Sequence, residues 1–289
     1  MSRAPALPPL FAVTEAGARR VGIRDGAHGQ PPSVHAALVG PGPAVYTGLR
    51  SRGARGLVAL SAHLDRLADS CRRVGLAPPD PARLRRALRE VLPRTDDTGC
   101  MVRIEVRATP PPQLDTDATV FLGLWPARPD DPARLAVGVR VATAPGARRV
   151  DPEAKGSAWV VERERWLRDP AAAEHLLLDE WGRLLEGFTS NLLVVAGGRV
   201  HVPRSGVLLG VTRGLLLRLC ARLALPVVEA PWSGAREAID ELAIMSSGRG
   251  IWPVAWLDGA PVGVGSPGPV TRRLAAAWAM AWPEWLEQP

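Results

Sequence analysis

The sequence is organised around residues 151–159, Asp151-Pro152-Glu153-Ala154-Lys155-Gly156-Ser157-Ala158-Trp159. Lys155 is the only lysine in the chain, and the remainder of its 36 Lys and Arg residues are arginines. A lysine amine can lose its proton near neutral pH and hold a carbonyl compound as a Schiff base, whereas a guanidinium stays charged. Lys155 is therefore a candidate for carbonyl chemistry. Composition alone leaves open the alternative that it is a chance survivor in an arginine-biased sequence.

Length and composition are those of a globular protein. The 289 residues are 46% hydrophobic and 22% charged, which allows one large domain or two smaller ones. No uncharged apolar run reaches the roughly 18 residues of a transmembrane helix, and the apolar patch after Met1–Pro5 is too short for a signal peptide. The cysteines Cys71, Cys100 and Cys220 are far apart, which favours buried thiols in a reducing cytoplasm over disulfides or a zinc site.

The net charge of +7 raises nucleic-acid binding as a possible function. The arginines argue against it, because they are spread along the chain and usually have acidic neighbours, as in residues 162–165 and 86–90. No basic block with interleaved aromatic residues occurs, so an arginine-rich solvated surface is the better interpretation. The five histidines are too scattered to form a ligand cluster on one helix, and we expect no metal site.

Patterns along the chain predict two domains of mixed α/β or α+β type. The stretch 126–134 carries three prolines among polar residues, so we expect it to be a linker between a small N-terminal domain, 1–125, and a larger domain, 135–289. Met101–Arg107 alternates polar and apolar residues, which predicts a half-solvated strand. Other predicted elements are a helix capped by Ser61, a helix opened by Pro81, a hairpin at Gly197-Gly198, and helices over 211–224 and 270–285.

Four pieces of the second half share a chemical theme. Lys155 offers an amine, and Glu186 offers a carboxylate beside Gly187 at the end of a predicted strand. The stretch 206–213, Gly-Val-Leu-Leu-Gly-Val-Thr-Arg, opens a helix whose first N–H groups, with the Thr212 hydroxyl, can bind a phosphate. Ser246-Ser247-Gly248 is a second hydroxyl-rich loop. An amine, a carboxylate and two anion-binding loops together indicate pyridoxal phosphate, whose ring nitrogen the carboxylate would keep protonated.

These motifs resemble the class IV aminotransferases. That family comprises the fold-type IV pyridoxal-phosphate enzymes and includes branched-chain and D-amino-acid aminotransferases and aminodeoxychorismate lyase. The resemblance runs from about residue 45 to the end of the chain. It rests on Tyr46–Arg50, Ser61–Leu67, Lys155, Leu185–Leu192, Gly206–Arg213 and the stretch from Glu241 to Val254.

The resemblance implies a role for each matching residue. Lys155 would be the Schiff-base lysine and the catalytic acid and base, and Glu186 would be the partner of the ring nitrogen. The cofactor phosphate would be held by Arg66, Val211, Thr212 and Ser247. The implied fold has a small N-terminal α+β domain, a larger C-terminal domain and the cofactor between them, usually in a homodimer.

The sequence departs from the family pattern on the substrate side. Thr47 stands where the family commonly has an acidic residue, and Gly156–Trp159 follows the lysine where several relatives have a tyrosine. The expected function is an aminotransferase that moves an amino group between a small amino acid and a 2-oxo acid. The alternatives are a lyase of the aminodeoxychorismate type, which would release pyruvate by β-elimination, and a cofactor-binding relative without turnover or a basic binding module. The substrate and its stereochemistry stay open.

Overall fold

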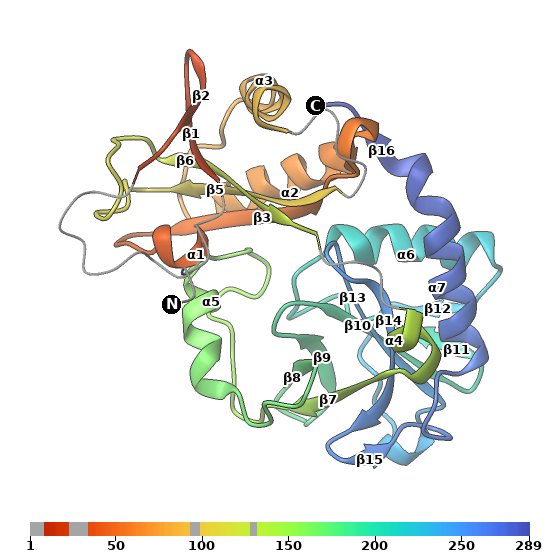
Figure 1. Ribbon diagram of the computed structural model, residues 1–289. Helices are drawn as coiled ribbons and strands as arrows, with labels where there is room; N and C mark the ends of the chain where they lie inside the picture. The colour runs from red at the N-terminus through yellow and green to blue at the C-terminus, as the bar shows by residue number, and fades with distance from the viewer. Residues whose placement is uncertain (1–8, 23–33, 93–98, 128–131) are drawn as a thin grey trace, which may run out of the picture. The chain divides into compact units, whose positions relative to one another are not determined.

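The computed structural model describes residues 9–22, 34–92, 99–127 and 132–289 (Figure 1). Contacts divide the chain into two compact units. The first comprises Met1–Ala127, Ala154–Val160 and Trp285–Pro289, and the second comprises Arg128–Glu153 and Val161–Glu284. The expected N-terminal stretch Met1–Pro5 and residues 128–131 of the expected linker lie outside the described part.

The first unit is built on a five-stranded antiparallel sheet in the order β2-β1-β6-β5-β3. These strands are β1 (Leu10–Thr14), β2 (Gly17–Arg20), β3 (Ala44–Arg50), β5 (Cys100–Arg107) and β6 (Val120–Pro126). Its helices are α1 (Val34–Ala37), α2 (Leu60–Arg73) and α3 (Pro81–Val91), with a 3-10 turn η1 (Gly53–Arg55). A two-stranded ribbon pairs β4 (Leu57–Val58) with β16 (Leu286–Glu287), so the end of the chain belongs to this unit.

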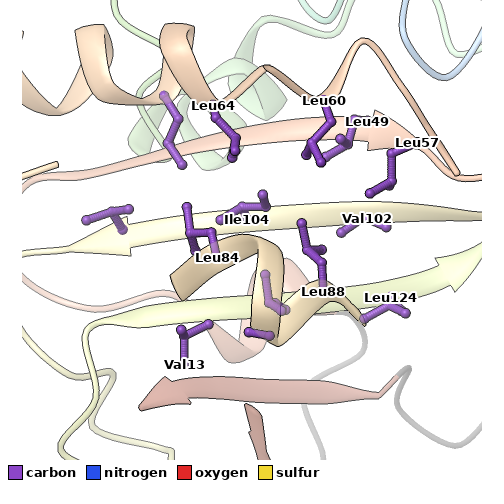
Figure 2. Close-up of a cluster of buried hydrophobic side chains, with 14 of the residues drawn as sticks. Val13, Leu49, Leu57, Leu60, Leu64, Leu84, Leu88, Val102, Ile104 and Leu124 are labelled. Carbon is purple, nitrogen blue, oxygen red and sulfur yellow. The ribbon is translucent and has the colours of Figure 1, made fainter. Parts of the chain in front are cut away.

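One face of this sheet packs against α2 and α3 through a core of aliphatic side chains (Figure 2). Figure 2 shows leucines of the helices, such as Leu64 and Leu88, close to strand residues such as Leu49, Val102 and Ile104. Alternation along the strands and a helical repeat along α2 and α3 direct these side chains to one layer. This packing fixes α2 beside β3, which matters for the side chains described below.

The two longer helices of the first unit begin in different ways. Asp80 caps α3, because its carboxylate accepts hydrogen bonds from the N–H groups of Ala82 (3.0 Å) and Arg83 (3.2 Å), and Pro81 opens the helix as predicted. The prediction that Ser61 caps α2 was wrong. The helix begins at Leu60, its cap position is Ala59 in the left-handed region, and Ser61 lies inside the first turn.

Strand β5 was predicted to be half solvated, and this was wrong. The alternating pattern is present, but every residue from Val102 to Arg107 is buried. Its polar members lie on the face opposite α2 and α3. Arg103 and Arg107 both pair there with Glu105, at 2.5 and 2.9 Å, so a buried carboxylate and not water is their partner.

The second unit contains a larger mixed sheet, in the order β12-β11-β10-β13-β14-β7-β8-β9, with β15 added beside β14. Its strands are β7 (Val139–Thr143), β8 (Glu174–Leu178), β9 (Leu184–Gly187), β10 (Asn191–Ala196), β11 (Arg199–His201), β12 (Val227–Val228), β13 (Glu241–Ser246), β14 (Gly250–Leu257) and β15 (Ala260–Pro261). β9 also pairs with β10 through Glu186 and Asn191. The strands β10, β13, β14, β7, β8 and β9 therefore form a closed ring of paired strands, which the pair Glu186 and Asn191 closes.

Helices α4 (Pro132–Val137), α6 (Val211–Arg222) and α7 (Pro269–Ala281) belong to the second unit. The final helix is shorter than the predicted 270–285 and gives way to a 3-10 turn, η4 (Trp282–Trp285). The segment after Lys155 forms a short helix, α5 (Ala158–Glu162), and a 3-10 turn, η2 (Arg163–Trp166). Another 3-10 turn, η3 (Arg236–Ala238), precedes β13. The hairpin at Gly197-Gly198 is confirmed, and both glycines have positive φ angles (55° and 71°), as a tight hairpin turn requires.

Within the described residues, no helix is both long enough and apolar enough to cross a membrane, and no group of His, Cys, Asp and Glu side chains could hold a metal ion.

Candidate active site

Lys155 lies in the first unit, on a short segment that adds to the edge of β3. The Tyr46 N–H donates to the Lys155 carbonyl (3.0 Å), the Ser157 N–H donates to the Ala44 carbonyl (2.8 Å), and the Lys155 N–H donates to the Ser70 hydroxyl of α2 (3.2 Å). The backbone of the lysine is therefore held by both a strand and a helix. Its ammonium nitrogen lies 4.8 Å from the centroid of the Tyr46 ring.

A second cation, the guanidinium of Arg103, lies over the ring of Tyr46. The guanidinium carbon of Arg103 lies 3.6 Å from the ring centroid, and Arg103 also donates to the Ser157 hydroxyl (3.2 Å). Arg103 is itself fixed by Glu105 on the same strand. Lys155 thus lies near a buried cluster, formed by Arg103, Glu105 and Arg107, in which two guanidinium groups share one carboxylate. Sequence reasoning missed this cluster because it read the alternation of β5 as exposure to water.

Arg66 projects from α2 towards Thr47 of β3. Its Nη2 donates to the Thr47 hydroxyl (2.6 Å), and that hydroxyl lies 2.8 Å from Nδ1 of His63. Burial, and then the positive charges of Arg66 and Lys155, hold the pKa of His63 well below its ordinary value. The imidazole is therefore neutral near pH 7, and its Nδ1 can accept a hydrogen bond from the Thr47 hydroxyl. This chain of contacts sets the direction of Arg66.

Glu186 lies in the second unit, at the end of β9, with only 2% of its surface exposed. Arg149 donates to its Oε1 at 2.6 Å, while the Leu208 N–H (3.1 Å) and the Asn191 side-chain nitrogen (3.3 Å) donate to Oε2. An ionised carboxylate only accepts hydrogen bonds, so donors on both of its oxygens fix its direction. A buried carboxylate held in this way suits a protonated ring nitrogen.

Val211 and Thr212 begin α6, directly after the cap residue Gly210. The first N–H groups of a helix have no acceptor within the helix and carry a partial positive charge, which favours an anion. The Thr212 hydroxyl lies 3.3 Å from the hydroxyl of Ser247, which belongs to the turn between β13 and β14. The structure therefore brings three of the four residues expected at the phosphate, Val211, Thr212 and Ser247, to one place in the second unit. Arg66 belongs to the first unit.

The turn that carries Ser247 is anchored by an ion pair. Arg249 donates to Glu174 (2.7 Å) and to the Thr189 hydroxyl (2.8 Å), and its own N–H closes the turn on the Ser246 carbonyl (3.1 Å). Glu174 is buried at the start of β8. Strands that are distant in sequence thus hold the hydroxyl-bearing turn.

Two of the residues that sequence reasoning missed are far from their partners in sequence. Arg149 reaches Glu186 across 37 positions of sequence, and Arg249 reaches Glu174 across 75. An arginine in a chain rich in arginine gives no local signal for such a pairing. Asn191 is different, because it stands five positions after Glu186 within a motif that the sequence already singled out.

Comparison with known proteins agrees with these motifs. The model of the class IV aminotransferase family matches residues 44–257. Among curated proteins, the branched-chain-amino-acid aminotransferase of Pseudomonas aeruginosa is 30% identical over 109 residues, and that of Escherichia coli strain K12 is 36% identical over 110 residues. These stretches cover 37% and 36% of this chain, and 36% and 35% of the relatives. The chain therefore aligns with just over a third of the length of each.

Solved structures match over nearly the whole chain. The E. coli branched-chain amino acid aminotransferase has a TM-score of 0.73 at 22% identity, covering 97% of this chain and 96% of that one. A putative branched-chain amino acid aminotransferase from Thermotoga maritima has a TM-score of 0.70 at 25% identity, covering 85% and 88%. A third, from Thermoproteus uzoniensis with norvaline, has a TM-score of 0.75 at 20% identity, covering 97% and 98%. These likenesses confirm the predicted mixed α+β fold.

Proposed function

Because this chain belongs to the class IV aminotransferase family, we propose that it is a pyridoxal-phosphate-dependent aminotransferase. It would move an amino group between a small amino acid and a 2-oxo acid. Branched-chain amino acids are the first donors to test, since the curated relatives carry that name. The single observation that carries the proposal is the only lysine of the chain, held by its backbone between β3 and α2, within a family match that spans residues 44–257.

The phosphate group would be held by the N-terminus of α6 and its neighbouring hydroxyls. The N–H groups of Val211 and Thr212 and the hydroxyls of Thr212 and Ser247 are hydrogen-bond donors of the kind that a phosphate dianion accepts. Arg66, directed by Thr47, would add a guanidinium that can bind two phosphate oxygens at once.

The ring nitrogen would be paired with Glu186. Its carboxylate is held by Arg149, Asn191 and the Leu208 N–H, so its direction is set before the cofactor arrives. When bound, pyridoxal phosphate supplies an aldehyde that condenses with amines and a ring that takes up the electron pair released at the substrate Cα. A carboxylate beside the ring nitrogen keeps that nitrogen protonated, which strengthens the uptake.

Lys155 would act on protons. Its Nζ would take the proton from the substrate Cα and return it on the product side. The ring of Tyr46 stands close to this amine, and the guanidinium of Arg103 lies over the same ring.

The homodimer and the cytoplasmic setting expected from the sequence belong to the same proposal. The three cysteines are buried, as the thiols of proteins in a reducing compartment commonly are.

Separate half-reactions test the proposal. The protein loaded with pyridoxal phosphate should show a visible band that changes on addition of an amino acid alone and returns on addition of a 2-oxo acid. The amino acid should appear as its 2-oxo acid in an amount equal to the cofactor. Pyruvate release from aminodeoxychorismate without any 2-oxo acid would instead identify the lyase. No band after added cofactor would contradict both enzyme functions.

A further inference from the structure

Asn191 is the only asparagine among the 289 residues. Elsewhere the chain uses Asp, Ser or Thr for short polar side chains. Asparagine has the shape of aspartate, but it carries two N–H donors and no charge. Its contacts, and not its rarity, show what this carboxamide does.

The carboxamide of Asn191 is buried between two parts of the second unit. Its nitrogen donates to Oε2 of Glu186 (3.3 Å) and to the carbonyl of Leu208 (2.7 Å). The opposite orientation of the amide would place its oxygen against these two acceptors, so the assignment of nitrogen and oxygen is determined by the contacts. The residue is 7% exposed and pairs with Glu186 at the point where β9 meets β10.

The oxygen of the same carboxamide faces the turn into α6. A Cβ atom built on Gly210 would lie 2.1 Å from Oδ1 of Asn191, so a side chain at position 210 would displace the carboxamide. Gly210 is the cap residue of α6, immediately before Val211 and Thr212. The Leu208 N–H also donates to Glu186. The loop that leads into α6 is therefore linked to the carboxylate twice, once directly and once through Asn191.

From these contacts we propose that Asn191 is a positioning residue that couples the two ends of the proposed cofactor site. One of its N–H groups fixes the carboxylate meant for the ring nitrogen, and the other fixes the loop that presents the phosphate-binding N–H groups. Movement at one end is transmitted to the other through this side chain, beside the direct hydrogen bond from the Leu208 N–H to Glu186. The inference rests on the proposed function and adds to it a link between ring recognition and phosphate recognition.

Neither aspartate nor alanine can replace this link. Asn191→Asp keeps the shape but replaces two donors with acceptors and sets a second negative charge beside Glu186. Asn191→Ala removes one donor from the Leu208 carbonyl and one from Glu186. We expect the loss of these buried hydrogen bonds to weaken the binding of pyridoxal phosphate and inorganic phosphate roughly tenfold or more.

A side-chain NMR measurement tests the link directly in the full-length protein. Protein labelled with ¹⁵N only in asparagine carries a single carboxamide, so it gives one pair of N–H signals. We expect two well-separated proton signals, because the two protons meet different acceptors. We also expect both signals to shift on addition of inorganic phosphate, which would contact α6 and not Asn191. A signal that ignores phosphate while phosphate binds would overturn the coupling.

Variants provide the second arm of the test. Asn191→Ala should weaken both pyridoxal phosphate and inorganic phosphate about tenfold or more and shift the pH dependence of the cofactor's visible band. Glu186→Gln should alter that pH dependence and change phosphate affinity less than Asn191→Ala does, because its amide oxygen can still accept from Asn191 and from the Leu208 N–H. Gln113→Ala is the matched control, since its carboxamide also binds backbone carbonyls, those of Ala36, Ala37 and Val39, but in the first unit. It should change neither property.

The outcomes separate this inference from the proposed function. A wild-type protein that binds cofactor with the expected band, beside an Asn191→Ala variant with unchanged phosphate affinity, would overturn the inference alone. A wild-type protein without any band would overturn the proposed function and the inference with it.

Discussion

At the scale of single residues, the site is determined by how each side chain is held. Thr47 shows this well, because its hydroxyl links Arg66 to the neutral imidazole of His63. The sequence marked Thr47 only as a departure from the family pattern. Its role became visible when the packing of α2 on β3 brought residues 16 and 19 positions apart into contact.

Replacement of Arg66 tests the one proposed phosphate-binding residue that lies in the first unit. Arg66→Ala removes a charge-assisted contact of roughly 1.5–3 kcal/mol, so pyridoxal phosphate should bind about 10 to 100 times more weakly. The visible band should return at saturating cofactor, because Lys155 is untouched. Titration of the band measures both effects.

Arg72→Ala is the matched control for this variant. Arg72 lies on the same helix and is 60% exposed, with Asp69 as its partner. Its loss should leave cofactor affinity unchanged. Equal affinities for Arg66→Ala and Arg72→Ala would make Arg66 one more surface arginine of α2.

At the scale of elements, α2 depends on a residue from the far end of the chain. The helix has no side-chain cap of its own, and Oε2 of Glu287 accepts the Ser61 N–H (2.9 Å) and the Ser61 hydroxyl (2.5 Å). Arg85 of α3 stands 3.6 Å from the same carboxylate. Sequence reasoning assigned the cap to Ser61 because it could see only neighbours in sequence, and the true acceptor is 226 positions away.

Loss of this carboxylate should destabilise the helix that carries His63 and Arg66. Glu287→Ala should lower the free energy of unfolding by about 1 kcal/mol, as loss of a helix cap typically does. Chemical denaturation followed by circular dichroism measures it. Glu284→Ala removes the exposed partner of Arg222 and should have little effect. Equal stability of Glu287→Ala and the wild type would show that α2 does not need the distant cap.

At the scale of the whole molecule, the mixed fold and the family could be predicted from the sequence, because both depend on local patterns and contiguous motifs. Strand β5, helix α3 and the hairpin at Gly197-Gly198 were all predicted from alternation, Pro81 or paired glycines. The grouping of residues 154–160 and 285–289 with the first unit was not, because a linear reading divides the chain once. These two segments join the first unit through pairing between residues that are distant in sequence, such as Val45 with Gly156 and Leu57 with Glu287.

The central claim is that Lys155 is the amine that holds the cofactor, and the whole chain offers no second lysine to take its place. The most direct measurement is borohydride reduction of the cofactor-loaded protein, followed by proteolysis and mass spectrometry. We expect one reduced cofactor per chain, attached at Lys155. We also expect a folded Lys155→Arg protein that gains no label at that position and has essentially no turnover, since a guanidinium neither condenses with the aldehyde nor moves the Cα proton. A label at another site, or near-normal turnover in Lys155→Arg, would show that Lys155 does not hold the cofactor.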